Sequence, residues 1–287
     1  MKTRRICMRF PEGRAKTLTF SYDDGVKEDV RFVDILNRYG MKGTFNLNSG
    51  CYAPEISDPE KPDRRMSESV ITELFANSPH EVALHSFSHP SLATLPSAAV
   101  AYETIRDREA LERQFGRIIR GMAYPNGSVS DEVVETLRLC GVAYARTVVS
   151  TERFKLPEDW LRLPATCHHN NPRLMELAEK FVNATIASPH QPQMFYLWGH
   201  TYEFSDNDNW HVIEEFCKYM SGRENEIWYA TNMEIFEYVE AYKRLLWSVD
   251  MSRVYNPTTR TLWFTYANQL VTIRPDETLC LEDLEVK

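Results

Sequence analysis

The sequence predicts an α/β fold in which about seven βα units close into a barrel, followed by a small antiparallel β module. Two observations lead to this prediction. Apolar, strand-like runs alternate with amphipathic helical stretches as far as residue 247, which is typical of a mostly parallel sheet. Beyond that point the pattern changes to period-two alternation with turn residues. We therefore place residues 1–247 in the barrel and residues 248–287 in the module.

The first half of the chain alternates regularly between the two patterns. Strands are expected at residues 16–22, 42–48, 81–86 and 117–125, and helices at 29–40, 67–76, 97–115 and 130–141. Ser67 and Ser130 are typical helix N-cap residues, and Gly141 lies just past the end of its helix. The polar, proline-rich stretch 53–65 is interpreted as an excursion loop.

The second half continues the alternation around one long loop. Strands are expected at residues 142–148, 193–200 and 226–231, helices at 171–186, 207–220 and 232–247, and the loop at 156–172. The β module that follows is a candidate for covering a sheet edge or for joining two copies of the chain in a homo-oligomer.

Composition restricts the possible partners and compartments. With 287 residues, 43% of them hydrophobic, the chain can bury a large single core. A net charge of −8 argues against a nucleic-acid partner, whose phosphates require a basic surface. No apolar run is long enough to span a membrane, and no apolar segment follows the basic residues of the amino terminus, so we expect a cytoplasmic protein. The six scattered cysteines are expected to be reduced.

Two short motifs carry the chemistry, and each follows an apolar strand. The segment SYDDG contains the adjacent carboxylates Asp23 and Asp24, and the segment HSFSH contains His85 and His89. An Asp–Asp–Gly run alone is usually a turn or a helix start, and two histidines four residues apart often occur by chance. Together they favour a metal site, because one carboxylate and two imidazoles leave an open position for water while the second carboxylate stays free as a base.

Other polar residues recur at the same edge of the predicted barrel. Reactive groups of parallel α/β barrels gather at the carboxyl ends of the strands. After the fourth and later strands, the sequence places the turn Tyr124–Gly127, then Arg146, and then His200 at such ends. This recurrence is stronger evidence for a site than either motif alone.

The chain resembles the polysaccharide deacetylases with NodB homology, carbohydrate esterase family 4. SYDDG and HSFSH resemble the first two motifs of that family, and weaker matches are AYPNG (residues 123–127) and LWGH (residues 197–200). The resemblance covers about residues 16–247 and implies a distorted (β/α)7 barrel. It also implies removal of N-acetyl groups from a poly- or oligosaccharide, with a divalent metal ion, Zn²⁺ first and Co²⁺, Ni²⁺ or Mn²⁺ as alternatives.

The resemblance also implies roles for single residues. Asp23 would be the general base and His200 the general acid, and the metal ligands would be Asp24, His85 and His89. The family's third-motif arginine is replaced by Ala123 in this chain, and Arg146 either substitutes for it or is an ordinary surface arginine. Residues assigned to substrate binding are Tyr124, Asn126 through its backbone N–H, Trp160, Leu197 and His168.

Several of these residues have a second interpretation. Asp159–Trp160 corresponds to the fourth motif, or is a loop with a packed tryptophan. Leu197 lies below the acetyl group or belongs to the core, and Trp198 and Tyr202 are sugar-stacking walls or core aromatics. His168 and His169 contact substrate or tune His200, and their alternation in an extended chain predicts that at most one of them does so.

Rival functions remain. The same fold could cleave another non-peptide C–N bond, it could bind saccharide without turnover, or the chain could be a purely structural α/β protein. No nucleophilic serine lies in a Gly-x-Ser-x-Gly turn, which argues against a serine esterase.

Overall fold

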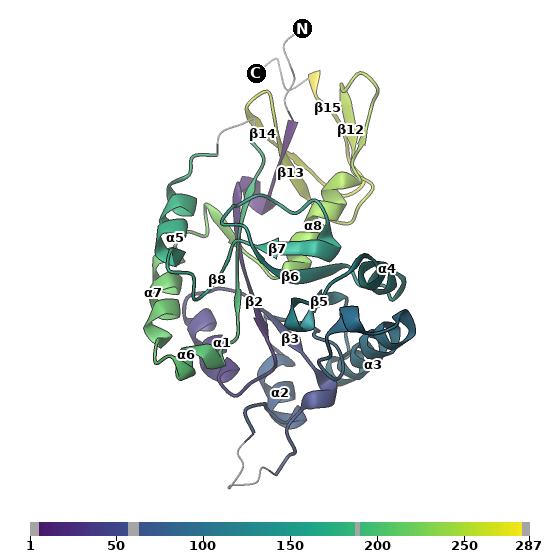
Figure 1. Ribbon diagram of the computed structural model, residues 1–287. Helices are drawn as coiled ribbons and strands as arrows, with labels where there is room; N and C mark the ends of the chain where they lie inside the picture. Colours follow the sequence, from purple (N-terminus) through teal and green to yellow (C-terminus); the bar gives the residue numbers. More distant parts are fainter. Residues whose placement is uncertain (1–5, 57–62, 187–189, 283–287) are drawn as a thin grey trace.

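A parallel sheet that closes on itself forms the centre of the protein. The computed structural model describes residues 6–56, 63–186 and 190–282. Neighbouring strands follow the order β7-β6-β5-β4-β3-β2-β9-β8, and β10 pairs with the start of β2. Only Thr166 separates β7 from β8, so the two ends of this path meet and the sheet becomes a barrel (Figure 1). The predicted α/β barrel is therefore confirmed.

The barrel strands are short, and helices cover their outer side (Figure 1). The strands are β2 Lys16–Asp23, β3 Thr44–Leu47, β4 Glu81–Leu84, β5 Gly121–Ala123, β6 Tyr144–Ser150, β7 Leu163–Ala165, β8 Cys167–His168, β9 Gln193–Gly199 and β10 Ile227–Tyr229. The helices are α1 Asp29–Arg38, α2 Glu68–Phe75, α3 Ser97–Phe115, α4 Asp131–Leu139, α5 Leu174–Asn183, α6 Tyr202–Asp206, α7 Trp210–Met220 and α8 Asn232–Lys243.

Two failures of the sequence prediction concern the later site. The segment 156–172 is not only a loop, because it contains β7 and β8, which close the barrel. Five residues are too few to show a strand period, and a proline interrupts them, so the pattern was hidden. The short helix α6 was also missed. Part of the expected excursion loop 53–65 lies outside the described residues.

Alternation along the strands separates an apolar outer layer from a polar barrel interior. On β2, Leu18, Phe20 and Tyr22 pack in a core with helix residues. The intervening Ser21 and Asp23 point inward, where Asn46 of β3 donates hydrogen bonds to both. Because successive side chains of a strand face opposite sides, one short run supplies both the core and the site.

Antiparallel strands near the chain ends form the expected β module. Strands β13 Leu262–Tyr266 and β14 Gln269–Ile273 pair with each other, and β12 Arg253–Tyr255 pairs with β15 Thr278–Cys280. Strand β1 Ile6–Arg9 pairs with β13, and β11 Leu246–Trp247 pairs with β12. Residues before the predicted boundary at 247 therefore contribute strands to the module, while the division into two domains stays a prediction.

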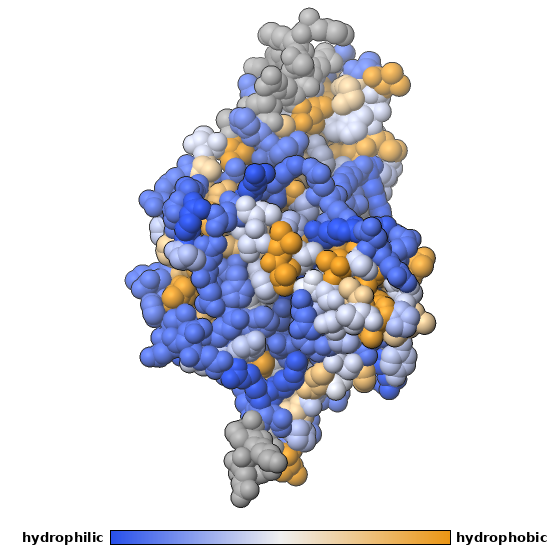
Figure 2. Space-filling view, in the orientation of Figure 1, coloured by the Kyte–Doolittle hydropathy of each residue, from blue (hydrophilic) through white to orange (hydrophobic). Residues whose placement is uncertain are grey.

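The surface has no dominant apolar region on the face drawn in Figure 2, where hydrophilic residues surround small separate hydrophobic patches. Among the described residues, no helix is both long and apolar enough to cross a membrane. Of the six cysteines, Cys7, Cys167 and Cys217 are buried.

Candidate functional site

Asp23 and Arg146 form a buried ion pair at the carboxyl ends of β2 and β6. The Nη2 atom of Arg146 donates to both carboxylate oxygens of Asp23, and its Nε donates to Ser21 Oγ at 3.2 Å. Arg146 is fully buried, so the alternative of a surface arginine is wrong. Burial alone would raise the pKa of Asp23, but the charges of Arg146, His85 and His200 and the hydrogen bond from Arg146 together outweigh it and lower this pKa to about 2.

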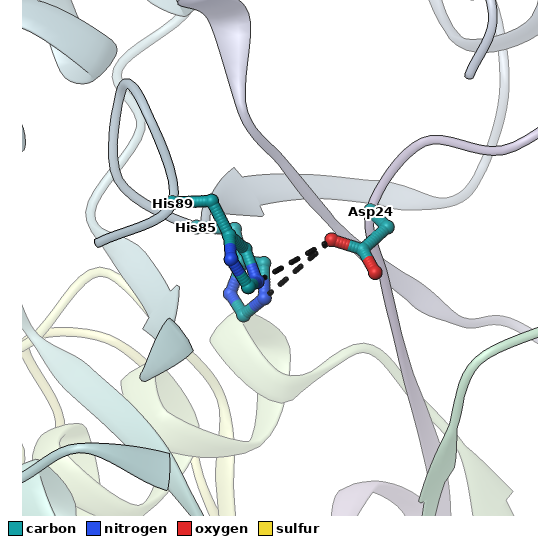
Figure 3. A group of neighbouring side chains, drawn as sticks. All are labelled: Asp24, His85 and His89. Carbon is teal, nitrogen blue, oxygen red and sulfur yellow. Dashed lines mark ion pairs between the residues drawn. The ribbon is translucent and has the colours of Figure 1, made fainter. Parts of the chain in front are cut away.

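Asp24, His85 and His89 bring their donor atoms together beside this pair (Figure 3). Asp24 Oδ1 lies 3.6 Å from His89 Nε2 and 4.0 Å from His85 Nε2. Ligand atoms of a tetrahedral zinc ion with bonds of about 2.0–2.1 Å lie about 3.4 Å apart. The three expected ligands therefore fit a divalent ion after a small adjustment.

The protonation state of His85 supports the same conclusion. Its Nδ1 lies 2.8 Å from the carbonyl oxygen of Ala123, so Nδ1 must carry the proton and Nε2 is left with a free lone pair. Burial lowers the pKa of His85 to about 4, so the ring is neutral at physiological pH. A neutral imidazole whose second nitrogen donates to a carbonyl is the usual form of a metal-binding histidine.

Arg65 orients the carboxylate of Asp24. Its Nη2 donates to Asp24 Oδ1 at 2.9 Å, and its Nη1 donates to Asn48 Oδ1 at 2.8 Å. Asp24 has a backbone φ of 85°, which non-glycine residues rarely adopt. Sequence reasoning missed Arg65 because it lies at the end of the loop predicted at 53–65, without a motif of its own.

His200 lies on the other side of Asp23. Its Nε2 is 3.8 Å from Asp23 Oδ2, the same distance that separates this oxygen from His85 Nε2. Its Nδ1 is 3.2 Å from Glu203 Oε1 in α6. Burial would lower the pKa of His200, but the hydrogen bond to Glu203 and the charges of Asp23 and Asp24 outweigh it and raise this pKa. Asp23 thus lies between the candidate metal ligands and the candidate acid.

Glu203 was missed by the sequence analysis, although a signal existed. A residue three positions after another lies on the same face of a helical turn, so a glutamate after His200 at this spacing can reach its ring. Asp159, in the candidate fourth motif, makes other contacts. It caps its own turn by accepting a hydrogen bond from the Leu161 N–H, and it forms an ion pair with Arg162.

A second group of residues could also hold a metal by distance alone, namely His168, His200 and Glu203. The tautomer of His168 argues against it. The backbone N–H of Asn170 donates to His168 Nδ1 at 3.1 Å, so the ring proton is on Nε2, the atom that faces Glu203. A protonated nitrogen cannot ligate a metal. His168 therefore differs from His85, whose Nε2 carries a free lone pair.

The remaining predicted contact residues lie in different surroundings. Tyr124 is buried and donates to the Leu161 carbonyl, and Trp160 packs edge-on against Phe236. Asn126 is exposed, with its side chain donating to Ser91 Oγ at 3.3 Å. The structure brings none of these three side chains into contact with Asp23.

Leu197 is also fully buried, in the core between sheet and helices. Its neighbour Trp198 takes the inward position, with its ring 4.4 Å from the guanidinium carbon of Arg146. The same ring lies 4.6 Å from that of His168. The two adjacent histidines were expected to diverge, but His168 and His169 both contact Glu203, so that prediction is wrong.

Comparisons with known proteins agree with this geometry. The profile of the polysaccharide deacetylase family matches residues 11–145. A chitin deacetylase from Pestalotiopsis sp is 26% identical over 155 residues, which are 54% of this chain and 49% of that protein, so the match spans about half of the relative's length.

Solved structures show the same fold at low sequence identity. A putative polysaccharide deacetylase from Mycobacterium smegmatis superimposes with a TM-score of 0.56 at 16% identity, covering 83% of this chain and 94% of that one. The Xyl-CE4 domain of a multidomain xylanase from the hindgut metagenome of Trinervitermes trinervoides gives a TM-score of 0.51 at 14% identity, covering 79% and 92%.

Proposed function

We propose that this chain, which belongs to the polysaccharide deacetylase family, is a metal-dependent hydrolase that removes N-acetyl groups from a poly- or oligosaccharide. The observation that carries the proposal is the position of Asp23. Its Oδ2 atom, which also accepts a hydrogen bond from Arg146, lies equally far from a candidate metal ligand, His85, and from a candidate proton donor, His200. Hydrolysis of an amide needs both kinds of group on either side of one reacting carbon.

A divalent ion would be held by Asp24, His85 and His89, with Zn²⁺ as the first candidate and Co²⁺, Ni²⁺ or Mn²⁺ as alternatives. When bound, such an ion supplies Lewis acidity, which polarises a carbonyl and lowers the pKa of a water molecule. The bare Nε2 of His85 and the partial exposure of His89 favour this assignment, because the site must admit ion, water and substrate.

The chain's own residues would carry the proton transfers. Asp23 is ionised at neutral pH and accepts a proton from the attacking water. Arg146 and Asn46 hold this carboxylate in place through hydrogen bonds. His200, which holds its proton more tightly than a free histidine, delivers that proton to the departing amine. An amine anion is a very poor leaving group, so cleavage requires this transfer.

The test is acetate release from chitooligosaccharides and peptidoglycan fragments, with and without a chelator. We expect release by the wild-type chain, loss on chelation, recovery on adding Zn²⁺, and loss in Asp23→Asn. Cyclic amides and ureides belong in the same panel. Turnover of those compounds alone would replace the proposal with hydrolysis of another C–N bond. Metal binding without any acetate release would indicate a saccharide-binding relative.

A further inference from the structure

One carboxylate, that of Glu203, contacts three imidazole rings. Its Oε1 lies 3.2 Å from His200 Nδ1, and its Oε2 lies 3.1 Å from His168 Nε2 and 2.9 Å from His169 Nε2. The Asn170 side-chain amide adds a donor to Oε2 at 3.3 Å. Burial would raise the pKa of Glu203, but hydrogen bonds from the three rings hold this pKa well below its usual range. A carboxylate that accepts several N–H groups remains ionised.

His168 can serve this carboxylate only as a neutral donor. Its Nδ1 accepts the backbone N–H of Asn170, so adding a second ring proton there would place two N–H groups against each other. The single proton of the ring therefore stays on Nε2 and points to Glu203.

His169 is restricted to the same state for a different reason. It is almost completely buried and stacks near the rings of Tyr22 and Phe204, 5.7 and 4.1 Å away. Among the described residues neither ring nitrogen has a hydrogen bond of ideal geometry, but Nε2 lies 2.9 Å from Glu203 Oε2, whereas Nδ1 is packed against Gly199, where an added Cβ would lie only 2.0 Å from it. Burial lowers the pKa of His169 to about 4, so this ring is neutral with its proton facing Glu203.

His200 is then the one ring of the three that can carry a positive charge opposite Glu203. We propose that His168 and His169 are positioning residues. As neutral N–H donors they hold the carboxylate of Glu203 in place, so that its negative charge stabilises the protonated form of His200. This rests on the proposed function, in which His200 delivers a proton to the amine. It assigns to His168 a role in place of substrate contact.

Other charged and titratable groups also face His200, and the test must separate them. Asp23 and Asp24 approach from β2, and the phenol ring of Tyr202 lies 5.2 Å away in α6. The two carboxylates act on His200 Nε2, whereas Glu203 acts on Nδ1. Removing only the charge of Glu203 therefore changes the interaction at Nδ1 of His200 and leaves the interactions at Nε2 unchanged.

The experiment is a histidine NMR titration of the Zn²⁺-saturated chain labelled with ¹⁵N-histidine, in the absence of substrate. We expect the ring proton of His168 to be on Nε2, because Nδ1 accepts the Asn170 N–H, and His169 to be neutral between pH 6 and pH 8. His200 alone of the three should titrate above the usual value of about 6.5. In Glu203→Gln, which keeps the side-chain shape, the pKa of His200 should fall by about one unit or more.

Matched variants make the result specific. Asp159→Asn should leave the titration of His200 unchanged. His168→Gln, which retains an N–H donor at a similar position, should keep most of the shift, and His168→Leu should lose it. Glu203→Asp provides a second charged variant if Glu203→Gln fails to fold. A cationic His168, a His200 titration that Glu203→Gln does not alter, or an equal shift in Asp159→Asn would overturn the proposal.

These spectra need no substrate, so they separate this inference from the proposed function. Absence of acetate release by the wild-type chain, with the expected spectra, would reject the hydrolase and leave the arrangement of the three rings established. In an active chain, Glu203→Gln should also lower the upper pH limit of kcat/KM by the same amount as the NMR shift. An unchanged pH profile would contradict the role assigned to Glu203.

Discussion

Arg146 lies inside the barrel with its guanidinium against both carboxylate oxygens of Asp23, 123 positions away in the sequence. The two residues come from β6 and β2, which are not neighbours in the sheet. Ala123 is paired in register with Arg146 on the adjacent strand β5, and its small side chain leaves room for the long one. The positive charge that the family resemblance expects at Ala123 is therefore supplied from the next strand.

Removing Arg146 should damage both stability and turnover. Arg146→Met leaves the carboxylate of Asp23 buried without its counter-charge, and breaking one side of a buried ion pair costs about 3–5 kcal/mol. Urea unfolding should show this loss, and acetate release should fall with it. The double variant Asp23→Asn/Arg146→Met should recover much of the stability and none of the activity. A double variant as unstable as the single one would contradict this account of the pair.

Metal binding should depend on the group Asp24, His85 and His89, and not on the second group that contains His168. His89→Gln should lose high-affinity Zn²⁺ binding in isothermal titration calorimetry, because His89 Nε2 is one of the three donor atoms. His211→Gln, at an exposed position, serves as the control and should bind like the wild type. His168→Gln should also bind normally, since the tautomer of His168 does not permit ligation. Loss of binding in His168→Gln would show that the metal is held by the second group.

Neighbouring residues on β9 should have opposite effects when truncated. Leu197→Ala should lower the free energy of unfolding by about 2–5 kcal/mol, as expected for a fully buried leucine, with little change in KM. Trp198→Ala should instead raise KM for the saccharide, because the tryptophan packs on Arg146 at the inner face. Steady-state kinetics and urea unfolding of both variants check this. A raised KM in Leu197→Ala alone would restore the role first assigned to Leu197.

A buried carboxyl should make stability depend on pH. Burial raises the pKa of Asp29 to about 8, while its oxygens accept hydrogen bonds from Thr201 Oγ1 and the Val26 N–H. The folded chain therefore keeps a proton that the unfolded chain loses near pH 4. Stability from this group is complete below about pH 4 and declines as the pH rises towards 8, where the folded chain also loses the proton, by at most about 1.4 kcal/mol per pH unit.

Asp29→Asn should remove this dependence. Urea unfolding at pH 5, 6.5 and 8 should show that the free energy of unfolding of the variant increases relative to that of the wild type as the pH rises. Parallel curves for the two proteins would mean that Asp29 titrates normally in the folded chain.

The sequence predicted the elements that have a clear period and missed those that do not. Strand β2 and helix α4 were recognisable from alternation and from the Ser130 cap, whose Oγ accepts the Val133 N–H at 3.2 Å. Strand β7 has three residues, with a proline among them, and β8 has two, so their pairing with β6 and β9 comes from the closed sheet rather than from local preference.

The same distinction applies to the candidate site. The motifs located Asp23, Asp24, His85, His89 and His200, because adjacent or regularly spaced polar residues after a strand are visible in one dimension. Arg65 and Glu203 carry no such signal, since their function depends on which atoms they meet across the barrel mouth. The sequence also did not predict which side of the sheet each strand residue faces. Leu197 was assigned to substrate but lies in the core, whereas its neighbour Trp198 faces the barrel interior.

The closing of the barrel at Thr166 has a consequence for how such a site could be switched off. The three candidate metal ligands follow β2 and β4, whereas His168 lies in β8, the strand that begins at this closure, and contacts Glu203 in α6, the helix after β9. A chain nicked or unzipped between β8 and β9 would still capture its ion, yet it would hold that ion without a competent proton donor.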